Sequence, residues 1–255
     1  MDIEKYSYYF TDDEQLCIEL LDKVKRAKKS FKYIQTDFIS PDAQEFLKKV
    51  CFEEGLFVTF FGGLGDFERA VGIIGTEEYD GSAPIDVIKV SGNFKFENLI
   101  HRDFLGAVLS LGIKREKVGD INLYEDGAEV YLHKEISDYV CFNLTKIKNT
   151  GVKALKINYN DARERIQQFS EKKINVASLR LDCIVSSAAN LSREKASSLI
   201  RNGSVKINYC LCDDSSKKLN EGDLVSIRGY GRFYINSLLG ITKKDRISLL
   251  IKKYI

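Results

Sequence analysis

Between residues 85 and 157, the spacing of apolar residues switches repeatedly between the two-residue period of a β-strand and the longer period of a helix. The predicted runs are 85–90 (strand), 104–111 (helix, ended by Gly112), 121–124 and 129–132 (strands of a hairpin), 137–147 (helix) and 152–157 (strand). Asp126-Gly127 lies between the two hairpin strands and is a favourable turn pair. The order β-α-β-β-α-β is the split-βαβ pattern of ferredoxin-like and RRM-like domains, although a fold alone does not define a function.

The first 82 residues predict a separate α/β domain. Apolar residues at positions 16, 20, 21 and 24 recur at helical spacing. A second helix is expected over 40–52, because Ser40 is a favourable N-cap and Pro41 suits the first helical position. Two strands, 56–61 and 69–74, are expected on either side of a glycine-rich turn.

Residues 178–255 predict a further compact α+β domain. Apolar spacing indicates a helix over 181–188, ended by Asn190, and Ser192 caps a second helix over 193–201. Strands are expected at 205–208, 224–228, 232–235 and 246–251.

The predicted organisation is therefore α+β, with three domains and one connector. These are an N-terminal α/β domain (1–82), a split-βαβ domain (83–160), a polar connector (161–177, helical over 162–169) and a C-terminal domain (178–255). No apolar run approaches the roughly 20 residues of a membrane span, and the N-terminus lacks the apolar core of a signal peptide. We expect a cytoplasmic protein with no membrane partner, whose six cysteines are reduced thiols.

The small net charge of +2 conceals an asymmetry along the chain. Residues 178–255 contain 14 Lys and Arg but only 7 Asp and Glu, whereas the rest of the chain is acidic. A basic end on an acidic chain is typical of a module that binds a polyanion such as RNA. An uneven distribution of ordinary surface charges explains the same numbers equally well.

Positive side chains gather around the second C-terminal helix. Its N-terminus near Ser192 presents free backbone N–H groups, and Arg193 and Lys195 lie in the first turn, where the helix dipole disfavours cations. Cations at a position that the helix dipole disfavours suggest a function there, such as pairing with a phosphate. The full candidate RNA-binding set is Arg180, Ser192, Arg193, Lys195, Arg201, Lys206, Arg228 and Arg232. Ordinary solvated charges are the alternative interpretation.

The same region resembles a known family. The segments 180–182, 191–196, 199–208 and 221–223 resemble, in order, the S4 RNA-binding domain. The segments 100–120, 177–179 and 227–233 resemble the bacterial YlmH family, which carries such a domain. The resemblance spans most of the chain and is weakest before residue 55.

The resemblance implies a non-enzymatic factor that binds ribosomal RNA and transfer RNA on the large ribosomal subunit, with a part in rescuing obstructed nascent chains. A role in cell division has also been suggested for the family. We expect no cofactor and a monomer. In the family, the strand that ends at Asn208 usually turns through Asn-Gly, but here Tyr209 follows. Because tyrosine tolerates positive φ poorly, we expect a longer or different turn here. Such a turn would change the position of Asn208, the residue that the family pattern suggests as an RNA contact.

Two motifs suggest other chemistry. Gly62-Gly63-Leu64-Gly65 follows a strand like a dinucleotide fingerprint, but a strand and not a helix is expected after it, which favours a hairpin turn. His101-Arg102-Asp103 is similar to a kinase catalytic loop without its other motifs. We interpret it as a helix start capped by Asp103. The alternative is a second RNA surface formed by His101, Arg102, Lys114 and Arg115.

Metal binding and base stacking are less strongly indicated. Cys210-x-Cys212 is at most half of a zinc site, and the only histidines, His101 and His133, are expected in another domain. We therefore expect no metal. Tyr230 and Tyr234 are candidate stacking platforms, and packing in the core or in a turn explains them at least as well.

Two competing functions stay open. S4 domains also accompany RNA-modifying enzymes, but residues 1–177 contain no convincing catalytic aspartate motif or cofactor loop. We therefore expect no catalytic residues. The other alternative is a protein-interaction module linked to cell division, in which the acidic N-terminal half binds a partner.

Overall fold

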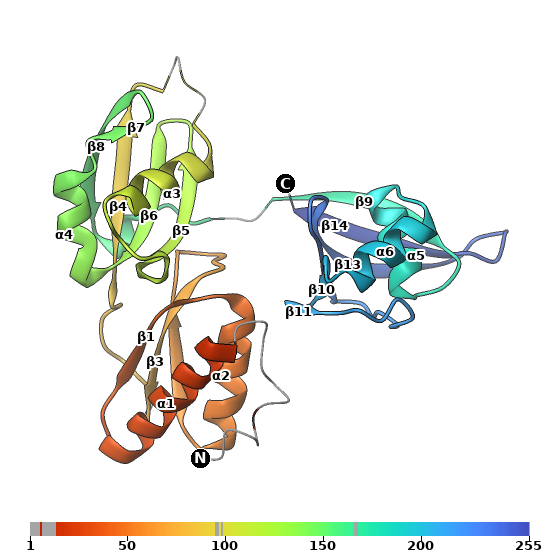
Figure 1. Ribbon diagram of the computed structural model, residues 1–255, viewed down its shortest axis with the longest axis horizontal. Helices are drawn as coiled ribbons and strands as arrows, with labels where there is room; N and C mark the ends of the chain where they lie inside the picture. The colour runs from red at the N-terminus through yellow and green to blue at the C-terminus, as the bar shows by residue number, and fades with distance from the viewer. Residues whose placement is uncertain (1–5, 7–13, 95–96, 98, 166–167, 255) are drawn as a thin grey trace. The chain divides into compact units, whose positions relative to one another are not determined.

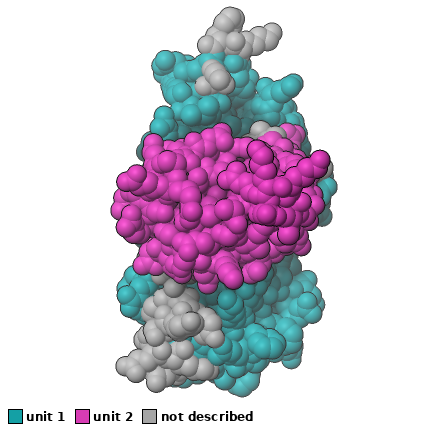
Figure 2. Space-filling model, turned by 90° about the vertical axis from the view of Figure 1, so that its right-hand side faces the viewer, with its two compact units in different colours: residues 1–166 teal, residues 167–255 magenta. Residues whose placement is uncertain are grey.

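The structure is a computed structural model that describes residues 6, 14–94, 97, 99–165 and 168–254. The chain forms two compact units, 1–166 and 167–255 (Figures 1 and 2). Both units mix helices and strands, so the predicted α+β class is confirmed. The predicted boundary between 82 and 83 falls inside unit 1, between its two sheets.

The first part of unit 1 packs two helices on a three-stranded antiparallel sheet of order β1-β3-β2. Its elements are α1 (Glu14–Ser30), β1 (Ile34–Ile39), α2 (Pro41–Glu53), β2 (Phe57–Phe61) and β3 (Ala70–Gly75). The helical stripe Leu20, Leu21 and Val24 is buried, as its spacing predicts. The glycine-rich segment lies in the β2–β3 loop and no helix follows it, in agreement with the hairpin interpretation.

The second part of unit 1 is a five-stranded sheet of order β5-β6-β4-β8-β7. Its elements are β4 (Ile85–Gly92), α3 (His101–Ser110), η2 (Arg115–Lys117), β5 (Val118–Tyr124), β6 (Gly127–His133), α4 (Lys134–Asn143), β7 (Lys146–Ile147), β8 (Thr150–Ile157) and η3 (Tyr159–Asp161). The predicted β-α-β-β-α-β order is present, with α3 and α4 on one face of the sheet (Figure 1).

Two local predictions in this part need correction. The helix expected over 137–147 runs from Lys134 to Asn143, and Ile147 lies instead in β7, where it pairs with Thr150. The hairpin turn is Glu125-Asp126, because Tyr124 pairs with Gly127. Gly127 has a φ of 146°, and a Cβ there would lie 2.0 Å from the carbonyl oxygen of Val90. Glycine is therefore needed at the first residue after the turn, and not within the turn as expected.

Unit 2 packs two helices on a six-stranded antiparallel sheet of order β11-β10-β12-β13-β14-β9. Its elements are β9 (Phe169–Val176), α5 (Leu181–Ala189), α6 (Arg193–Arg201), β10 (Val205–Ile207), β11 (Cys210–Leu211), β12 (Leu224–Ile227), β13 (Gly231–Ile241) and β14 (Ile247–Tyr254). Asn190 adopts the left-handed conformation that ends α5, as predicted.

The predicted helical connector is wrong. Residues 162–165 are not helical, and 169–176 form β9, which pairs along its whole length with β14. Ile174 and Val176 reach the core of unit 2, so the C-terminal sheet begins before residue 178. None of the described helices is long and apolar enough to cross a membrane.

Candidate nucleic-acid interface

A buried carboxylate organises two arginines at the start of the helical pair in unit 2. Asp182 is the second residue of α5, and its side chain is only 5% exposed. Arg193 donates to its Oδ2 at 2.6 Å, and the Nε of Arg180 donates to its Oδ1 at 3.1 Å. The side chains of Arg193 and Arg180 are 60% and 42% exposed. Asp182 therefore fixes two guanidinium groups that still face solvent.

The protonation of Asp182 follows from these contacts. Burial alone raises the pKa of its carboxyl, but hydrogen bonds from Arg180 and Arg193 outweigh burial and leave the pKa below its usual value. The carboxylate also accepts the backbone N–H of Cys183 at 2.9 Å. Arg193 in the first turn of α6 thus has an internal counter-charge, so its position alone does not require a bound phosphate.

The rest of α6 matches the sequence prediction. The Ser192 hydroxyl accepts the backbone N–H of Lys195 at 3.2 Å and caps the helix. Ala196 and Ile200 are buried in the core, which leaves Lys195 and Arg201 exposed. We call the set Arg180, Arg193, Lys195 and Arg201 the arginine surface.

The predicted RNA-binding set is divided between two sides of unit 2. Lys206 and Arg232 alternate along their strands with core residues such as Val205 and Phe233, so they lie on the sheet face opposite α5 and α6. Arg228 is exposed in the turn between β12 and β13. Lys206 and Arg232 therefore lie apart from the arginine surface, although the sequence suggested that Lys206 extends it.

The turn after β10 corrects a second expectation. Ile207 pairs with Cys210, so the turn is the short Asn208-Tyr209, with φ values of 49° and 69°. Tyr209 therefore adopts the positive φ that was expected to force a longer turn. The Asn208 amide donates to Asp223 at 2.8 Å and accepts the N–H of Leu224 at 2.9 Å, which makes it a structural brace between strands.

The second predicted surface lies at the start of α3 in unit 1. His101 and Arg102 are exposed in its first turn, and the Lys114 side chain is 79% exposed. Asp103 accepts the N–H of Ile100 at 2.9 Å, which confirms the predicted cap. Arg115 differs, because it folds back to donate to the carbonyl of Val118.

The structure adds residues to this surface that the sequence did not suggest. Asp120 is 8% exposed and accepts the backbone N–H groups of Glu68 and Arg69 at 2.7 and 3.2 Å. Burial raises its pKa. Burial, and then the charge of Arg115, lower the pKa of Arg69 to about 10. Arg165 lies 4.0 Å from Asp120. The charges of Arg115, Asp120 and Arg165 act on the pKa of His101, so chain folding brings these groups near it. No local motif marks Asp120 or Arg165 in the sequence.

One group of potential metal ligands occurs among the described residues. Asp37, His133 and Glu135 place their ligand atoms within 4.8 Å of one another. However, the ammonium of Lys117 contacts Asp37 at 2.6 Å and Glu135 at 2.5 Å, so a lysine already supplies the cation. In unit 2, Cys212 belongs to the Cys210-x-Cys212 motif, and its thiol donates to the carbonyl oxygen of Asp214 at 3.7 Å.

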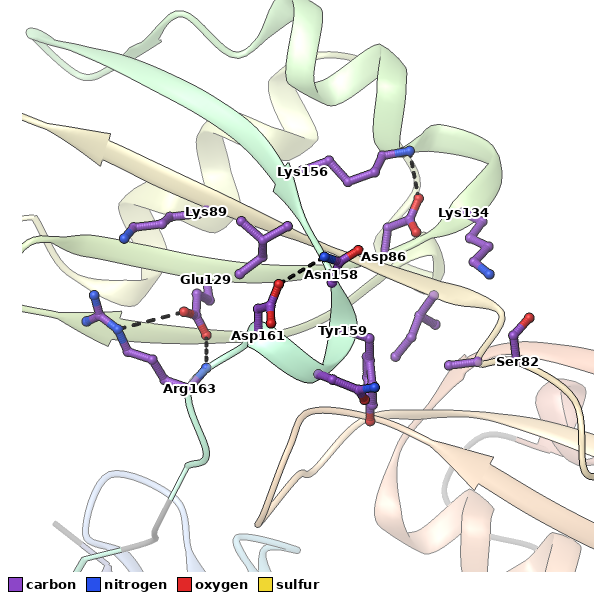
Figure 3. A pocket seen from close by; sticks show the side chains of 14 residues that line it. Ser82, Asp86, Lys89, Glu129, Lys134, Lys156, Asn158, Tyr159, Asp161 and Arg163 are labelled. Atoms are coloured by element: carbon purple, nitrogen blue, oxygen red, sulfur yellow. Dashed lines mark hydrogen bonds and ion pairs between the residues drawn. The ribbon is translucent and has the colours of Figure 1, made fainter.

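A pocket of about 840 Å³ opens beside η3 in unit 1 (Figure 3). Two of its cations pair with carboxylates of the same lining: Lys156 lies 2.9 Å from Asp86, and Arg163 lies 3.9 Å from Glu129. These internal pairs leave the pocket without a uniform charge that would select a ligand.

Comparisons with known proteins agree with this architecture. Residues 79–161, which contain the five-stranded sheet of unit 1, match the family described as "Putative RNA-binding domain in YlmH". The chain belongs to the YlmH family. It is 30% identical over 244 residues to "Ribosome-associated protein quality control protein P2" of Bacillus subtilis (strain 168), covering 94% of this chain and 95% of that relative.

A solved structure supports the fold. "Cell division protein ylmH from Streptococcus pneumoniae" matches with a TM-score of 0.53 at 19% identity, covering 60% of this chain and 95% of that one. At this identity the likeness concerns the fold. The family resemblance seen in the sequence is confirmed by the family match over residues 79–161 and by the relative from B. subtilis.

Proposed function

We propose that the protein is a non-enzymatic, ribosome-associated factor that binds folded RNA through the arginine surface. The observation that carries the proposal is the buried Asp182 carboxylate with Arg193 and Arg180 fixed on it at 2.6 and 3.1 Å. Two guanidinium forks held in place lose little conformational freedom when they meet phosphates. The name of the relative from B. subtilis supports the ribosomal assignment.

The arrangement acts by binding and orientation. Arginine forks donate two parallel hydrogen bonds to one phosphate, and exposed Lys195 and Arg201 add charge along α6. Such contacts follow the shape of an RNA backbone and carry no base code. We therefore propose a structured target, ribosomal RNA of the large subunit, with transfer RNA as a second ligand during the rescue of obstructed nascent chains.

Unit 1 supplies a second contact in this proposal. His101, Arg102 and Lys114 are exposed within the segment that matches the RNA-binding family. Two separate basic surfaces on one chain increase the effective affinity for a large RNA when both engage at once.

Co-sedimentation with ribosomes and separated subunits tests the proposal. Wild-type protein should travel with the large subunit, and Lys195→Ala/Arg201→Ala should stay near the top of the gradient. Lys243→Ala/Lys244→Ala is the control, because it removes the same charge from exposed residues of the β13–β14 turn. Equal losses in both variants would mean that net charge, and not the arginine surface, drives binding.

A second assay addresses catalysis. The protein is incubated with bulk RNA and a methyl donor, and the nucleosides are then separated by mass. We expect no modified nucleoside above the level of a heated sample. A new modified nucleoside would contradict the proposal and favour the alternative, an RNA-modifying enzyme.

A further inference from the structure

The sheet face of unit 2 opposite α5 and α6 carries an aromatic cluster. Val205, Phe233 and Ile251 are buried in one core with residues of α5 and α6, so they point to the helices. Their strand neighbours point the other way. We call this the aromatic face and define it by Phe169, Tyr234, Tyr254, Lys206, Arg232 and Lys252.

Strand register places these residues side by side. Tyr254 of β14 pairs with Phe169 of β9, and Tyr234 of β13 pairs with Lys252. Lys206 and Arg232 both lie opposite Ser226, one on each side of β12. The face therefore combines rings from three neighbouring strands with cations along the same rows.

The rings hold one another in place. The Phe169 and Tyr254 centroids are 5.0 Å apart, and those of Tyr234 and Tyr254 are 5.6 Å apart with a 35° tilt. The Tyr254 hydroxyl donates to the Tyr234 hydroxyl at 3.0 Å, and the Arg232 guanidinium lies 4.4 Å from the Tyr254 ring centre. Burial and this hydrogen bond raise the pKa of Tyr254, so the hydroxyl stays protonated. A fixed cluster loses little entropy when a flat ligand stacks on it.

Charge identifies the occupant. Lys206, Arg232 and Lys252 accompany the rings, and the acidic Glu171 is already 3.8 Å from Lys252. Phe169 remains 36% exposed and Lys252 37% exposed. Partly exposed rings among cations match a ligand that offers flat bases on a chain of phosphates.

We propose that the aromatic face binds unpaired nucleotides of RNA, with bases stacked on Phe169 and Tyr254 and phosphates near Lys206 and Arg232. This site lies beyond the proposed function, because it uses the opposite side of unit 2 from the arginine surface and recognises bases instead of backbone shape. Alanine substitution data for such platforms correspond to about 5- to 150-fold in affinity for each stacked base.

The test compares two probes of equal charge on the intact protein. Fluorescence anisotropy measures binding of an oligouridylate of about 12 nucleotides and of an abasic strand of the same length. We expect the oligouridylate to bind at least about 5-fold more tightly. Equal affinities in the wild type would overturn the proposal, and would leave the large-subunit sedimentation result untouched.

Substitutions on the two sides of unit 2 test which side carries the preference for bases. Tyr234→Leu/Tyr254→Leu should remove the preference for bases, whereas Tyr234→Phe/Tyr254→Phe keeps the rings and should keep most of it. Arg201→Ala lies on the other side and should leave the preference for bases unchanged. A preference that survives in the leucine variant would place the stacking elsewhere.

A fluorescent reporter tests where the bases bind without relying on the folding of the leucine variant. The chain contains no tryptophan, so Tyr254→Trp introduces a single indole at the centre of the aromatic face. Stacking of a base on the indole should quench its fluorescence with oligouridylate and not with the abasic strand. Binding of oligouridylate without quenching would contradict the proposed position of the bases.

Discussion

Replacing Asp182 by asparagine should destabilise unit 2 while preserving its shape. The carboxylate is buried, accepts the N–H of Cys183, and receives guanidinium donors from Arg180 and Arg193. Asparagine keeps one acceptor oxygen of nearly the same position but removes the charge and one acceptor. The variant therefore leaves two arginines without their common counter-charge.

The magnitude follows from the environment of the carboxylate. Hydrogen bonds to a charged group contribute about 1.5–3 kcal/mol, and exposure of the arginine partners places the loss in the lower part of this range. We expect the free energy of unfolding of unit 2 to fall by about 2 kcal/mol for Asp182→Asn. That loss corresponds to a roughly 30-fold increase in the exchange rate of amides that exchange through unfolding of the unit.

Native-state hydrogen exchange on the full chain measures this effect separately in each unit. Peptides that cover α5 and α6 report unit 2, and peptides from β4 and β6 report unit 1 as an internal reference. Asp213→Asn is the matched control, because Asp213 is exposed in the same unit. Its effect should stay within about 0.5 kcal/mol.

Two results would refute this reasoning. If Asp182→Asn and Asp213→Asn accelerate exchange equally, the buried carboxylate does not stabilise the helical pair. If exchange accelerates equally in both units, the substitution acts on the whole chain and not through Arg180 and Arg193.

The remaining predictions concern pH, salt and one turn. Because the pKa of the Asp182 carboxyl is lowered in the folded state, the stability that it contributes to unit 2 should be complete above about pH 4 and should disappear as pH falls through the lowered pKa. A pH series of denaturant titrations should then show the free energies of unfolding of the wild type and of Asp182→Asn converging in acid. Arg201→Ala should reduce the log–log salt slope of RNA binding by about 0.7–0.9, and an unchanged slope would exclude a phosphate contact at this residue. Asn208→Ala removes the brace to Asp223 and Leu224 and should cost about 1–2 kcal/mol in a denaturant titration, whereas no loss would show that the turn holds without it.

Sequence reasoning succeeded where a single residue controls the local backbone. Asn190 ends α5 in the left-handed conformation, and Ser192 caps α6 through the N–H of Lys195. Asp103 likewise caps α3. These signals depend on neighbours within a few residues, so the sequence contains all the information that they need.

Strand β9 could not be recognised from its own residues. Five of its eight positions are exposed, and only Ile174 and Val176 are buried. An edge strand with so few apolar residues looks like a polar connector. Its identity comes from β14, a partner that lies far along the chain.

The candidate site was predicted in composition but not in arrangement. The sequence places Arg193 in the first turn of a helix, but its pairing with Asp182 depends on how two helices meet. The sequence indicates that Lys206 faces away from the core, but it does not show that the outward sides of α6 and of the sheet lie on opposite faces of unit 2. Tyr209 shows a further limit, because tertiary context imposes a φ that its intrinsic preference opposes.

The position of β14 between β13 and β9 has a consequence for how unit 2 forms during synthesis. β9 is the first strand of the unit to be made, and among the described strands it pairs with the last one, β14. Until β14 has been completed, β9 has no edge to join, and β13 lacks one of its two neighbours. Closing such a long loop is slow compared with forming the α5–α6 pair, whose contacts are local. The helical pair can therefore form early on the growing chain, whereas the sheet closes only when the final strand is free to enter it.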